Sequence, residues 1–461
     1  MRWIFLLVAA TIMAEWEPDL RLTFDDSSSW VCENNGRCIV SHNNYVHIVW
    51  SDFRSQGAEI YCKRSTDYGQ SWEADRRLTF DSVAGPSSGM AAIAISGAYL
   101  HLVWRDTRDG NREIYYKRSS DNGLTWSNDV RLTNDPGISG LPSITAEDSM
   151  VYLVWQDDRE GNFEIFFKYS TNWGEDWSDD IRLTNDPGVS AYPTIAVQDS
   201  LLHLAWHDNR DGNAEIYYKR STNWGISWSP DTRLTEDPDL SGLPTIALSG
   251  SYVHLCWMDR RDGNGEIYYK WSSDHGLTWS VDRRLTNAPY KSSYPSLVAE
   301  GKNLHLAWYD FRDGNAEIYY KNSTDQGVNW SSDLRLTNSS GTSQWPSIAL
   351  ADTMLNLVWM DDRDGNWEIY YKRNPNGNVY LNQERSPKIT PLLLRIDNRI
   401  EIDGLPSGSR LYLFDPLGRR LNTLQVKNQR AVVPLPYSAG LYLLVIETPI
   451  SVTNQWIVVI K

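Results

Sequence analysis

Seven tryptophans recur along this chain at an almost constant interval. Trp50 and Trp104 are 54 residues apart, and the next five intervals are 51 residues each, which gives the set Trp50, Trp104, Trp155, Trp206, Trp257, Trp308 and Trp359. A strict period of about 50 residues over most of a chain is typical of one supersecondary unit repeated in a stack or a ring. The period therefore predicts seven repeated units.

Each unit contains four short runs rich in β-branched and aromatic residues. In the fourth copy these runs are 192–196, 202–206, 215–219 and 232–235, and Gly, Asn, Asp or Pro separates them. Four strands in a unit of about 50 residues are typical of a β-propeller blade, whose strands are lettered A to D from the central channel outward. We therefore predict an all-β protein with a seven-bladed β-propeller over residues 15–380.

The two ends of the repeat array predict how the ring closes. The seventh unit loses its pattern at 373–380, where a fourth strand would be expected, whereas residues 16–23 match residues 126–133 of the second unit in spacing. Both segments carry Trp, Asp and then Arg-Leu-Thr. We expect the N-terminal strand to complete the last blade, which would remove an open sheet edge.

Composition and the N-terminus predict an exported protein. The chain has 461 residues and a formal net charge of −15, with no basic stretch that would suit nucleic acid. Residues 1–14 resemble a signal peptide, because Arg2 precedes an apolar run and Ala10 and Ala14 are small residues near a cleavage point. This run is too short to span a bilayer, and we expect no transmembrane segment. The predicted location is secreted or attached to the outer cell surface.

The cysteines and histidines predict no metal site and no cofactor. Cys32 and Cys38 flank a turn-like sequence and are a candidate disulfide in an oxidising compartment, whereas Cys62 and Cys256 fit core positions. No Cys/His spacing is typical of zinc. Five of the eight histidines occupy one repeated position in strand B, which favours packing over ligation: His47, His101, His203, His254 and His305.

A repeated motif between strands C and D resembles a known family. Ser-x-Asp-x-Gly-x-x-Trp occurs at 65–72, 119–126, 272–279 and 323–330, and two further copies carry Asn at the acidic position. The motif is similar to the Asp box, or BNR repeat, of sialidase-like propellers. The resemblance implies that the box is a folding element on the side opposite the active site, where its acidic residue ties the turn to backbone N–H groups. The corresponding residues here are Asp67, Asp121, Asn172, Asn223, Asp274 and Asp325.

The loops between strands B and C carry a second motif, Asp-x-Arg followed by Glu. In the second unit it consists of Asp106, Arg108 and Glu113. Paired carboxylates and arginines could serve a glycosidase. However, a two-residue turn at Gly110 and Asn111 would place Arg108 opposite Glu113 as an ion pair, and a catalytic site would not recur in every blade. We therefore predict a structural role for the motif, and a core role for the repeated tryptophans.

Candidate ligand-binding residues lie where the blades differ. The residue after each blade tryptophan varies, as does the residue before the strand A proline, and both positions should line the rim of the channel. A concave mouth lined by polar and aromatic residues that differ from blade to blade suits a ligand. The equal alternative is a solvated rim whose sequence varies without a function. The candidates are Arg105, Gln156, His207, Tyr309, Tyr192, Tyr294 and Trp345.

The sialidase resemblance does not supply catalytic residues. That family binds its substrate's carboxylate with an arginine in a Phe/Tyr-Arg-Ile-Pro motif, but the corresponding strand starts here, such as 141–144 and 192–195, contain no arginine. The catalytic residues are therefore left unassigned.

The repeat ends near residue 380, and a different segment follows. A polar linker over 381–391 leads to a region, 392–461, whose apolar runs at 392–396, 410–421, 438–446 and 456–461 predict a small β-sandwich. Asp415-Pro-Leu-Gly-Arg419 and Gly440-Leu-Tyr442 make this region similar to the C-terminal sorting domain of the type IX secretion system. The resemblance implies that the secretion machinery is a partner; a generic accessory domain is the alternative.

Two functions are consistent with these features. The first is an exported module that binds a glycan or another surface ligand at its rim. The alternative is a sialidase-like glycoside hydrolase with a site on the channel-mouth face, which would need two carboxylates about 5 to 9 Å apart in a pocket. Apart from these two, a purely structural surface protein with no small ligand is a further possibility.

Overall fold

The structure is a computed structural model that describes two units of the chain separately. One unit comprises Trp16–Asn378, and the other contains Val379–Lys461. The described residues are 16–32, 37–55, 57–80, 87–351, 354–375, 377, 399–403, 410–414, 420–425, 430–434, 440–447 and 452–459. The predicted signal peptide and the predicted linker lie outside them.

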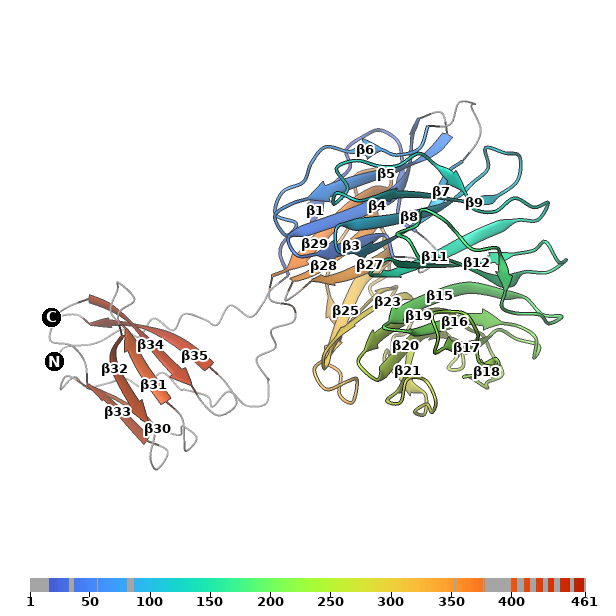
Figure 1. The fold of residues 1–461 in the computed structure, drawn as a ribbon. Helices are drawn as coiled ribbons and strands as arrows, with labels where there is room; N and C mark the ends of the chain where they lie inside the picture. The colour runs from blue at the N-terminus through green and yellow to red at the C-terminus, as the bar shows by residue number, and fades with distance from the viewer. Residues whose placement is uncertain are drawn as a thin grey trace. The chain divides into compact units, whose positions relative to one another are not determined.

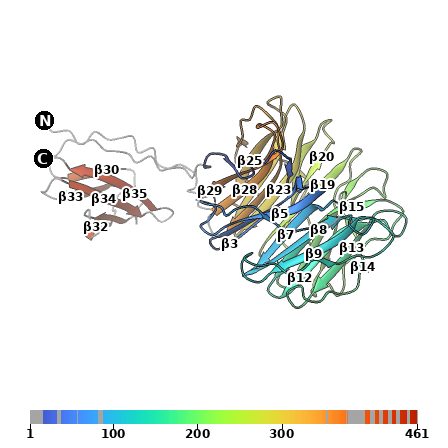
Figure 2. The same ribbon diagram turned by 90° about the horizontal axis from the view of Figure 1, so that it is seen from above.

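The larger unit is a seven-bladed β-propeller, as the tryptophan period predicted. Its sheets follow one another around the domain in chain order, so that β27 lies beside β3 (Figures 1 and 2). The first blade contains β2 (Ser29–Trp30), β3 (Ile39–His42), β4 (Tyr45–Ser55), β5 (Gly57–Ser65) and β6 (Arg76–Arg77). The second contains β7 (Gly89–Ser96), β8 (Tyr99–Asp106), β9 (Glu113–Ser119) and β10 (Val130–Arg131).

The next three blades repeat this antiparallel order. Blade three consists of β11 (Ser139–Glu147), β12 (Met150–Asp157), β13 (Glu164–Ser170) and β14 (Ile181–Arg182). Blade four consists of β15 (Ser190–Gln198), β16 (Leu201–Asp208), β17 (Glu215–Ser221) and β18 (Thr232–Arg233). Blade five consists of β19 (Ser241–Ser249), β20 (Tyr252–Asp259), β21 (Glu266–Ser272) and β22 (Arg283–Arg284).

The last two blades bring the ends of the repeat array together. Blade six consists of β23 (Ser292–Glu300), β24 (Asn303–Asp310), β25 (Glu317–Ser323) and β26 (Leu334–Arg335). The seventh sheet consists of β27 (Ser343–Ala351), β28 (Met354–Asp361), β29 (Glu368–Asn374) and β1 (Leu20–Arg21). Within it, Leu20 pairs with Tyr371 and Arg21 with Tyr370.

The core lies between adjacent blades. Trp206 of blade four, for example, packs in one buried cluster with Tyr152 and Phe167 of blade three. The seven blade tryptophans are almost completely buried, which confirms their predicted core role. Each sheet is covered on both faces by its neighbours, and large aromatic side chains fill that space with a large apolar area.

The ends of the strands define two faces of the propeller. At one end of β15 and β16, Ser190 pairs with Asp208 beside the B-to-C loop; we call this the mouth face. At the other end, Gln198 pairs with Leu201. The Asp-box turns lie at that end, because Trp224 N–H donates to the Ser200 carbonyl; we call this the Asp-box face.

The smaller unit contains two sheets among its described residues. β30 (Arg399–Asp403) pairs with β33 (Arg430–Pro434), and the second sheet has the order β32-β31-β34-β35. Its strands are β31 (Arg410–Phe414), β32 (Arg420–Gln425), β34 (Gly440–Glu447) and β35 (Val452–Val459). The single run predicted at 410–421 was wrong, because it spans the paired strands β31 and β32. Across the described parts of the chain, no helix is long and apolar enough to span a membrane.

Candidate functional site

The innermost strands of the propeller surround an axial cavity of about 260 Å³. Strand A of every blade contributes to its wall, and most of the residues that line it are aliphatic in type. Toward the mouth face, strand A is irregular in six blades, because its pairing with strand B shifts just before the proline position. Any candidate rim residue on strand A therefore lies at a bulge, where the chain can re-aim a side chain.

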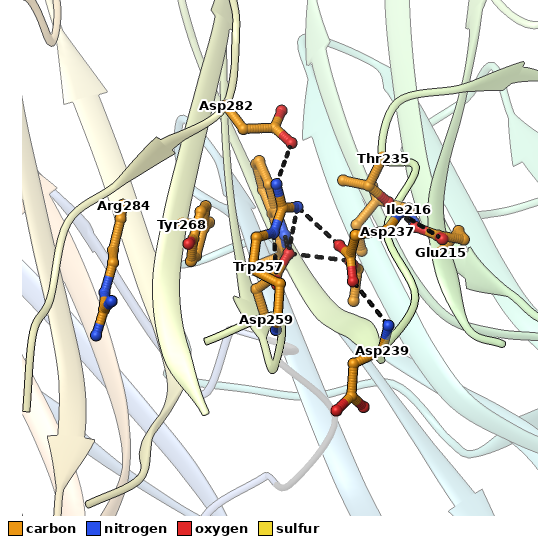
Figure 3. Close-up of polar contacts among 12 residues, drawn as sticks. Glu215, Ile216, Thr235, Asp237, Asp239, Trp257, Asp259, Tyr268, Asp282 and Arg284 are labelled. Atoms are coloured by element: carbon orange, nitrogen blue, oxygen red, sulfur yellow. Dashed lines mark hydrogen bonds and ion pairs between the residues drawn. The ribbon is translucent and has the colours of Figure 1, made fainter. Parts of the chain in front are cut away.

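The Asp-x-Arg motif forms a buried charge network in each blade. In blade five, Trp257 Nε1–H donates to Asp259 Oδ2 over 2.7 Å, and Arg261 donates to both carboxylate oxygens over 2.6 and 2.8 Å. Arg261 also pairs with Asp282 and Asp237, at 3.0 and 2.9 Å (Figure 3). Burial alone would raise the pKa of Asp259, but the hydrogen bonds from Arg261 and Trp257 outweigh burial and lower it.

The glutamate of the same motif has different partners. In blade five, Glu266 accepts hydrogen bonds from Arg284 Nη2 over 2.8 Å and from Thr286 Oγ1 over 2.6 Å. Asp259 and Glu266 are both 0% exposed, so neither can reach a ligand. These contacts support the structural role predicted for the motif.

The register predicted for this loop was wrong. Asp106, not Arg108, lies opposite Glu113, and six residues connect the two strands. Arg108 instead binds Asp106 and Asp129, while Glu113 binds Arg131. The repulsion expected between the facing carboxylates is offset because a different arginine neutralises each of them.

Three candidate residues form an aromatic group in blades six and seven. The rings of Tyr294 and Trp345 have centroids 6.1 Å apart at 62°, and Tyr294 stacks on Tyr309 at 5.6 Å and 20°. Tyr294 and Trp345 are half-buried at the bulge, with φ of 52° and 51°. Tyr309 is only 5% exposed and therefore supports Tyr294 from beneath. Two members of the group, Tyr294 and Trp345, are therefore partly exposed.

The polar candidates form a separate group in blades three and four. Tyr192 N–H donates to Gln156 Oε1 over 3.3 Å, and the Tyr192 ring lies 4.9 Å from the His207 ring. Burial lowers the pKa of His207 to about 4, so its imidazole is neutral at physiological pH. Arg105 lies in blade two, with Nη1 4.0 Å from the Met90 sulfur. The candidates therefore do not converge on one point.

Three residues at the mouth face were missed from the sequence. Trp30 and Phe53 of blade one are 36% and 37% exposed, with ring centroids 4.7 Å apart. Arg37 contributes to the wall of the axial cavity. For Trp30 and Arg37, the signal that could have found them is the departure of blade one from the repeat, since this blade carries an extra segment between β2 and β3. Phe53 offers no such signal, because Phe311 occupies the same position in blade six.

The Asp-box residues accept hydrogen bonds within their own turns. Asp121 Oδ1 accepts hydrogen bonds from Ser119 Oγ and Thr125 N–H, over 2.7 and 2.8 Å. Asn223 Oδ1 accepts the equivalent bonds from Ser221 and Ser227, over 2.9 and 3.0 Å. Asn can therefore replace Asp in this turn.

The cysteine pair lies in the irregular segment of blade one. Cys32 and Cys38 are present as buried thiols, and Cys32 N–H donates to Cys38 Sγ over 2.9 Å. Burial raises the pKa of Cys38. The disulfide remains a prediction. In the described residues, no group of three His, Cys, Asp or Glu side chains is arranged to hold a metal ion.

Comparison with known proteins relates the propeller to enzymes that act on carbohydrates. No family model matches the chain. A sialidase of Clostridium perfringens and one of Paraclostridium sordellii are each 24% identical to it, over 40% and 39% of this chain. The propeller is related in sequence to sialidases. The matches cover 58% and 54% of those proteins, so the chain spans little more than half their length.

Two solved structures share the fold. A PL25 ulvan lyase has a TM-score of 0.54 at 11% identity, covering 77% of this chain and 95% of that one. The polysaccharide lyase Uly1 has a TM-score of 0.52 at 11% identity, covering 78% and 99%. At this identity the likeness concerns the fold alone.

Proposed function

We propose that the propeller is a glycan-binding module whose site lies on the mouth face. The observation that carries the proposal is the aromatic group of Tyr294 and Trp345, half-buried and backed by Tyr309. Aromatic faces suit the apolar faces of sugar rings, and a rigid, pre-formed platform loses little conformational entropy on binding. Polar side chains such as Gln156 and His207 offer hydrogen-bonding groups elsewhere on the same rim.

The comparisons support a carbohydrate ligand. The curated relatives are sialidases, and a PL25 ulvan lyase of the same fold is bound to -[GlcA(1-4)Rha3S]-. A carbohydrate ligand for this chain is the inference that accounts for both.

Binding is favoured over hydrolysis by the state of the motif carboxylates. A glycosidase needs two carboxylates that reach the substrate with different protonation states. The aspartates and glutamates of the repeated motif are buried and held by arginines, as Asp259 and Glu266 illustrate. The sialidase-like hydrolase therefore stays the second candidate, supported by the sequence relationship alone.

The proposal also covers how the ring closes and how the protein is exported. We infer that the N-terminal strand closes the ring, a role supported by the pairing of β1 with β29 and by Asp19, which binds Arg363 and Lys372 at 2.8 and 2.7 Å. We also propose export through residues 1–14 and a C-terminal β-sandwich that serves as a type IX sorting domain. The two sheets of the smaller unit are compatible with such a sandwich.

A glycan array tests this function. The full chain is applied to the array, and both retained protein and loss of terminal sugars are read. We expect retention without trimming, and roughly fivefold or greater weakening for Trp345→Ala, because stacking against one aromatic ring contributes about 1 to 3 kcal/mol. Trp224→Ala is the matched control, since Trp224 is 48% exposed on the Asp-box face. Trimming would establish the hydrolase, and absence of both signals would contradict a glycan function.

A further inference from the structure

The Asp-box face carries an aromatic pair between blades two and three. Tyr99 opens β8 on this face, where it pairs with Ser96, and Trp173 lies in the Asp-box turn of blade three. Their ring centroids are 4.0 Å apart and the ring planes meet at 21°, so the two rings stack. Both side chains are half-buried. The pair is therefore a partly exposed aromatic platform on the face opposite the mouth.

This platform is a departure of one blade pair from the repeat. In the other blade pairs, the residue that opens strand B and the one that follows the acidic position of the next Asp box are not both aromatic: Tyr45 with Asn122, Met150 with Trp224, Leu201 with His275, Tyr252 with Gln326, and Met354 with Tyr68. Tyr45 and Tyr252 stack on the histidine two residues further along their own strands. Tyr99 instead stacks on the neighbouring blade.

The backbone conformation of Trp173 does not by itself favour tryptophan. Its φ is 60°, in the left-handed region, and Asn122 has a φ of 54° at the same position in blade two. Asn adopts this conformation more often than other residues, whereas a bulky side chain adopts it at a cost in free energy. An exposed aromatic residue in such a conformation is the kind of departure that accompanies binding.

Polar groups hold Trp173 in place from both blades. Arg118 of blade two donates from Nη1 to the Trp173 carbonyl over 3.1 Å and from Nη2 to Glu175 Oε1 over 2.7 Å. The Trp173 N–H donates to the carbonyl of Ser149 in its own blade over 2.8 Å. The Glu175 side chain is 60% exposed, so its carboxylate is open to further donors. Because Arg118 and Glu175 form an ion pair, the charges beside the platform offset each other and suit a neutral ligand.

We propose that Tyr99 and Trp173 form a second glycan-binding site, on the Asp-box face, which takes a neutral sugar ring. The choice of a glycan rests on the proposed function, but the site shares no residue with the mouth face. A sugar ring stacks its apolar face on an aromatic ring, and its hydroxyl groups donate to a carboxylate such as that of Glu175. Two sites on opposite faces let one propeller bind two glycan chains, which strengthens its retention on a polysaccharide surface.

Native electrophoresis of the full chain through gels that contain a neutral polysaccharide tests the proposal. Separate gels contain galactomannan, xyloglucan or laminarin, and the loss of mobility with increasing polysaccharide concentration gives a dissociation constant. We expect at least one of them to slow the wild type. Trp345→Ala should leave a residual retardation, which the double variant with Trp173→Asn should lose. Trp173→Asn alone should weaken binding roughly fivefold or more, the usual effect of losing one stacking ring.

The substitutions come from other blades of the same protein, so that folding is preserved. Trp173→Asn reproduces Asn122 of blade two. Tyr99→Leu reproduces Leu201, which opens strand B of blade four, and it should weaken binding severalfold because it removes the ring that supports Trp173. The melting temperature of each variant reports its folding, and it should stay close to that of the wild type.

Trp224→Asn is the matched control. Trp224 occupies the same turn position in blade four, with a φ of 56°, and is 48% exposed. The residue in the place of Tyr99 is Met150, so the control removes an exposed tryptophan that no tyrosine supports. It should leave binding unchanged.

The outcomes distinguish this inference from the function on which it rests. If Trp345→Ala alone abolishes retardation, or if Trp173→Asn and Tyr99→Leu bind like the wild type, the second site is overturned and the glycan function stands. An equal loss in Trp224→Asn would also overturn the site, because exposed tryptophans would then act without the platform. If Trp173→Asn abolishes retardation and Trp345→Ala has no effect, the second site stands and the mouth site fails.

Failure of the wild type to bind any of the three polysaccharides is informative when it is combined with the glycan array. If the array still retains the protein, the neutral site is overturned and the glycan function stands. If the array also retains nothing, the proposed function fails and this inference fails with it.

Discussion

Asp259 and Glu266 lie directly opposite each other on β20 and β21, although both are carboxylates and both are 0% exposed. Arg261 neutralises the first, and Arg284, from strand D, neutralises the second. The same facing pair occurs in all seven blades. The motif that resembles a ring of catalytic groups is therefore a set of internal ion pairs that joins strands B, C and D.

Removing one of these carboxylates should strongly destabilise the propeller. Asp259→Asn leaves Arg261 and the Trp257 N–H without their charged acceptor, and breaking a buried pair costs about 3 kcal/mol or more of unfolding free energy. Equilibrium unfolding in urea measures this change. Asp179→Asn, at an exposed loop position, is the control and should stay within about 0.5 kcal/mol of wild type. Equal values for the two variants would contradict a structural role of the network.

Stability should fall as the pH drops below about 6.5, because strand B histidines are held neutral. Burial, followed by repulsion from Arg118, lowers the pKa of His101 to about 3. The folded state therefore binds fewer protons than the unfolded state between these values. The stabilisation is complete above the unfolded pKa and is lost as the pH falls toward the folded one.

Blade seven suggests the variant that tests this pH dependence. Its equivalent of His101 is Asn356, whose Oδ1 accepts a 2.5 Å hydrogen bond from Tyr371, just as His101 Nδ1 contacts Tyr116 at 2.7 Å. Between pH 6.5 and pH 5, the free energy of unfolding of His101→Asn should therefore fall by about 2 kcal/mol less than that of the wild type. Urea unfolding at pH 5, 6.5 and 8 measures how the free energy of unfolding of each protein depends on pH. The same dependence in both proteins would rule out His101 as its source.

The Asp-box turn should tolerate Asn but not Ala. Asp121→Asn keeps the acceptor that Asn223 provides in blade four, so we expect a loss below about 0.5 kcal/mol. Asp121→Ala removes the acceptor for Ser119 and Thr125 and should cost about 1 to 2 kcal/mol. Thermal unfolding of both variants provides the comparison. An Asn variant as unstable as the Ala variant would show that the negative charge is what the turn requires.

Cys32 and Cys38 should form a disulfide when the protein is exposed to an oxidising medium. The Cys32 backbone already lies 2.9 Å from the Cys38 sulfur, and the two residues bracket a short segment. Mass spectrometry of the unfolded protein, treated with an alkylating reagent, should then find Cys32 and Cys38 alkylated only if the protein was first reduced. Cys62 and Cys256, buried in different blades, serve as internal controls that are alkylated in either case. Alkylation of all four without reduction would exclude the bond.

The architecture could be predicted from the sequence because each blade repeats the same local pattern. The tryptophan interval set the number of blades, and the four apolar runs of each unit correspond to its strands. The run at 410–421 was misjudged because it contains residues of two paired strands, β31 and β32. The register at Arg108 was misjudged because the favourable arrangement depends on Arg131, which local turn preferences do not include.

The contacts between residues at the mouth face could not be predicted from the sequence pattern. The candidates Tyr294, Tyr309 and Trp345 do assemble, whereas Arg105, Gln156 and His207 belong to blades on another part of the rim. Trp30 and Arg37 escaped notice because the segment that carries them departs from the repeat.

By itself, the sequence determined the blade number, the buried tryptophans and the turn chemistry of the Asp box, because these depend on residues close together in the chain. Only the tertiary structure decided which carboxylates are neutralised and which side chains meet at the mouth. The first feature depends on pairing between strands of one blade, since Arg284 on strand D neutralises Glu266 on strand C. The second depends on blades that are neighbours in space although their residues are far apart in sequence. Arg37 illustrates the difference: its setting is made by strands from both ends of the repeat array, beside Ser347 and Ile93.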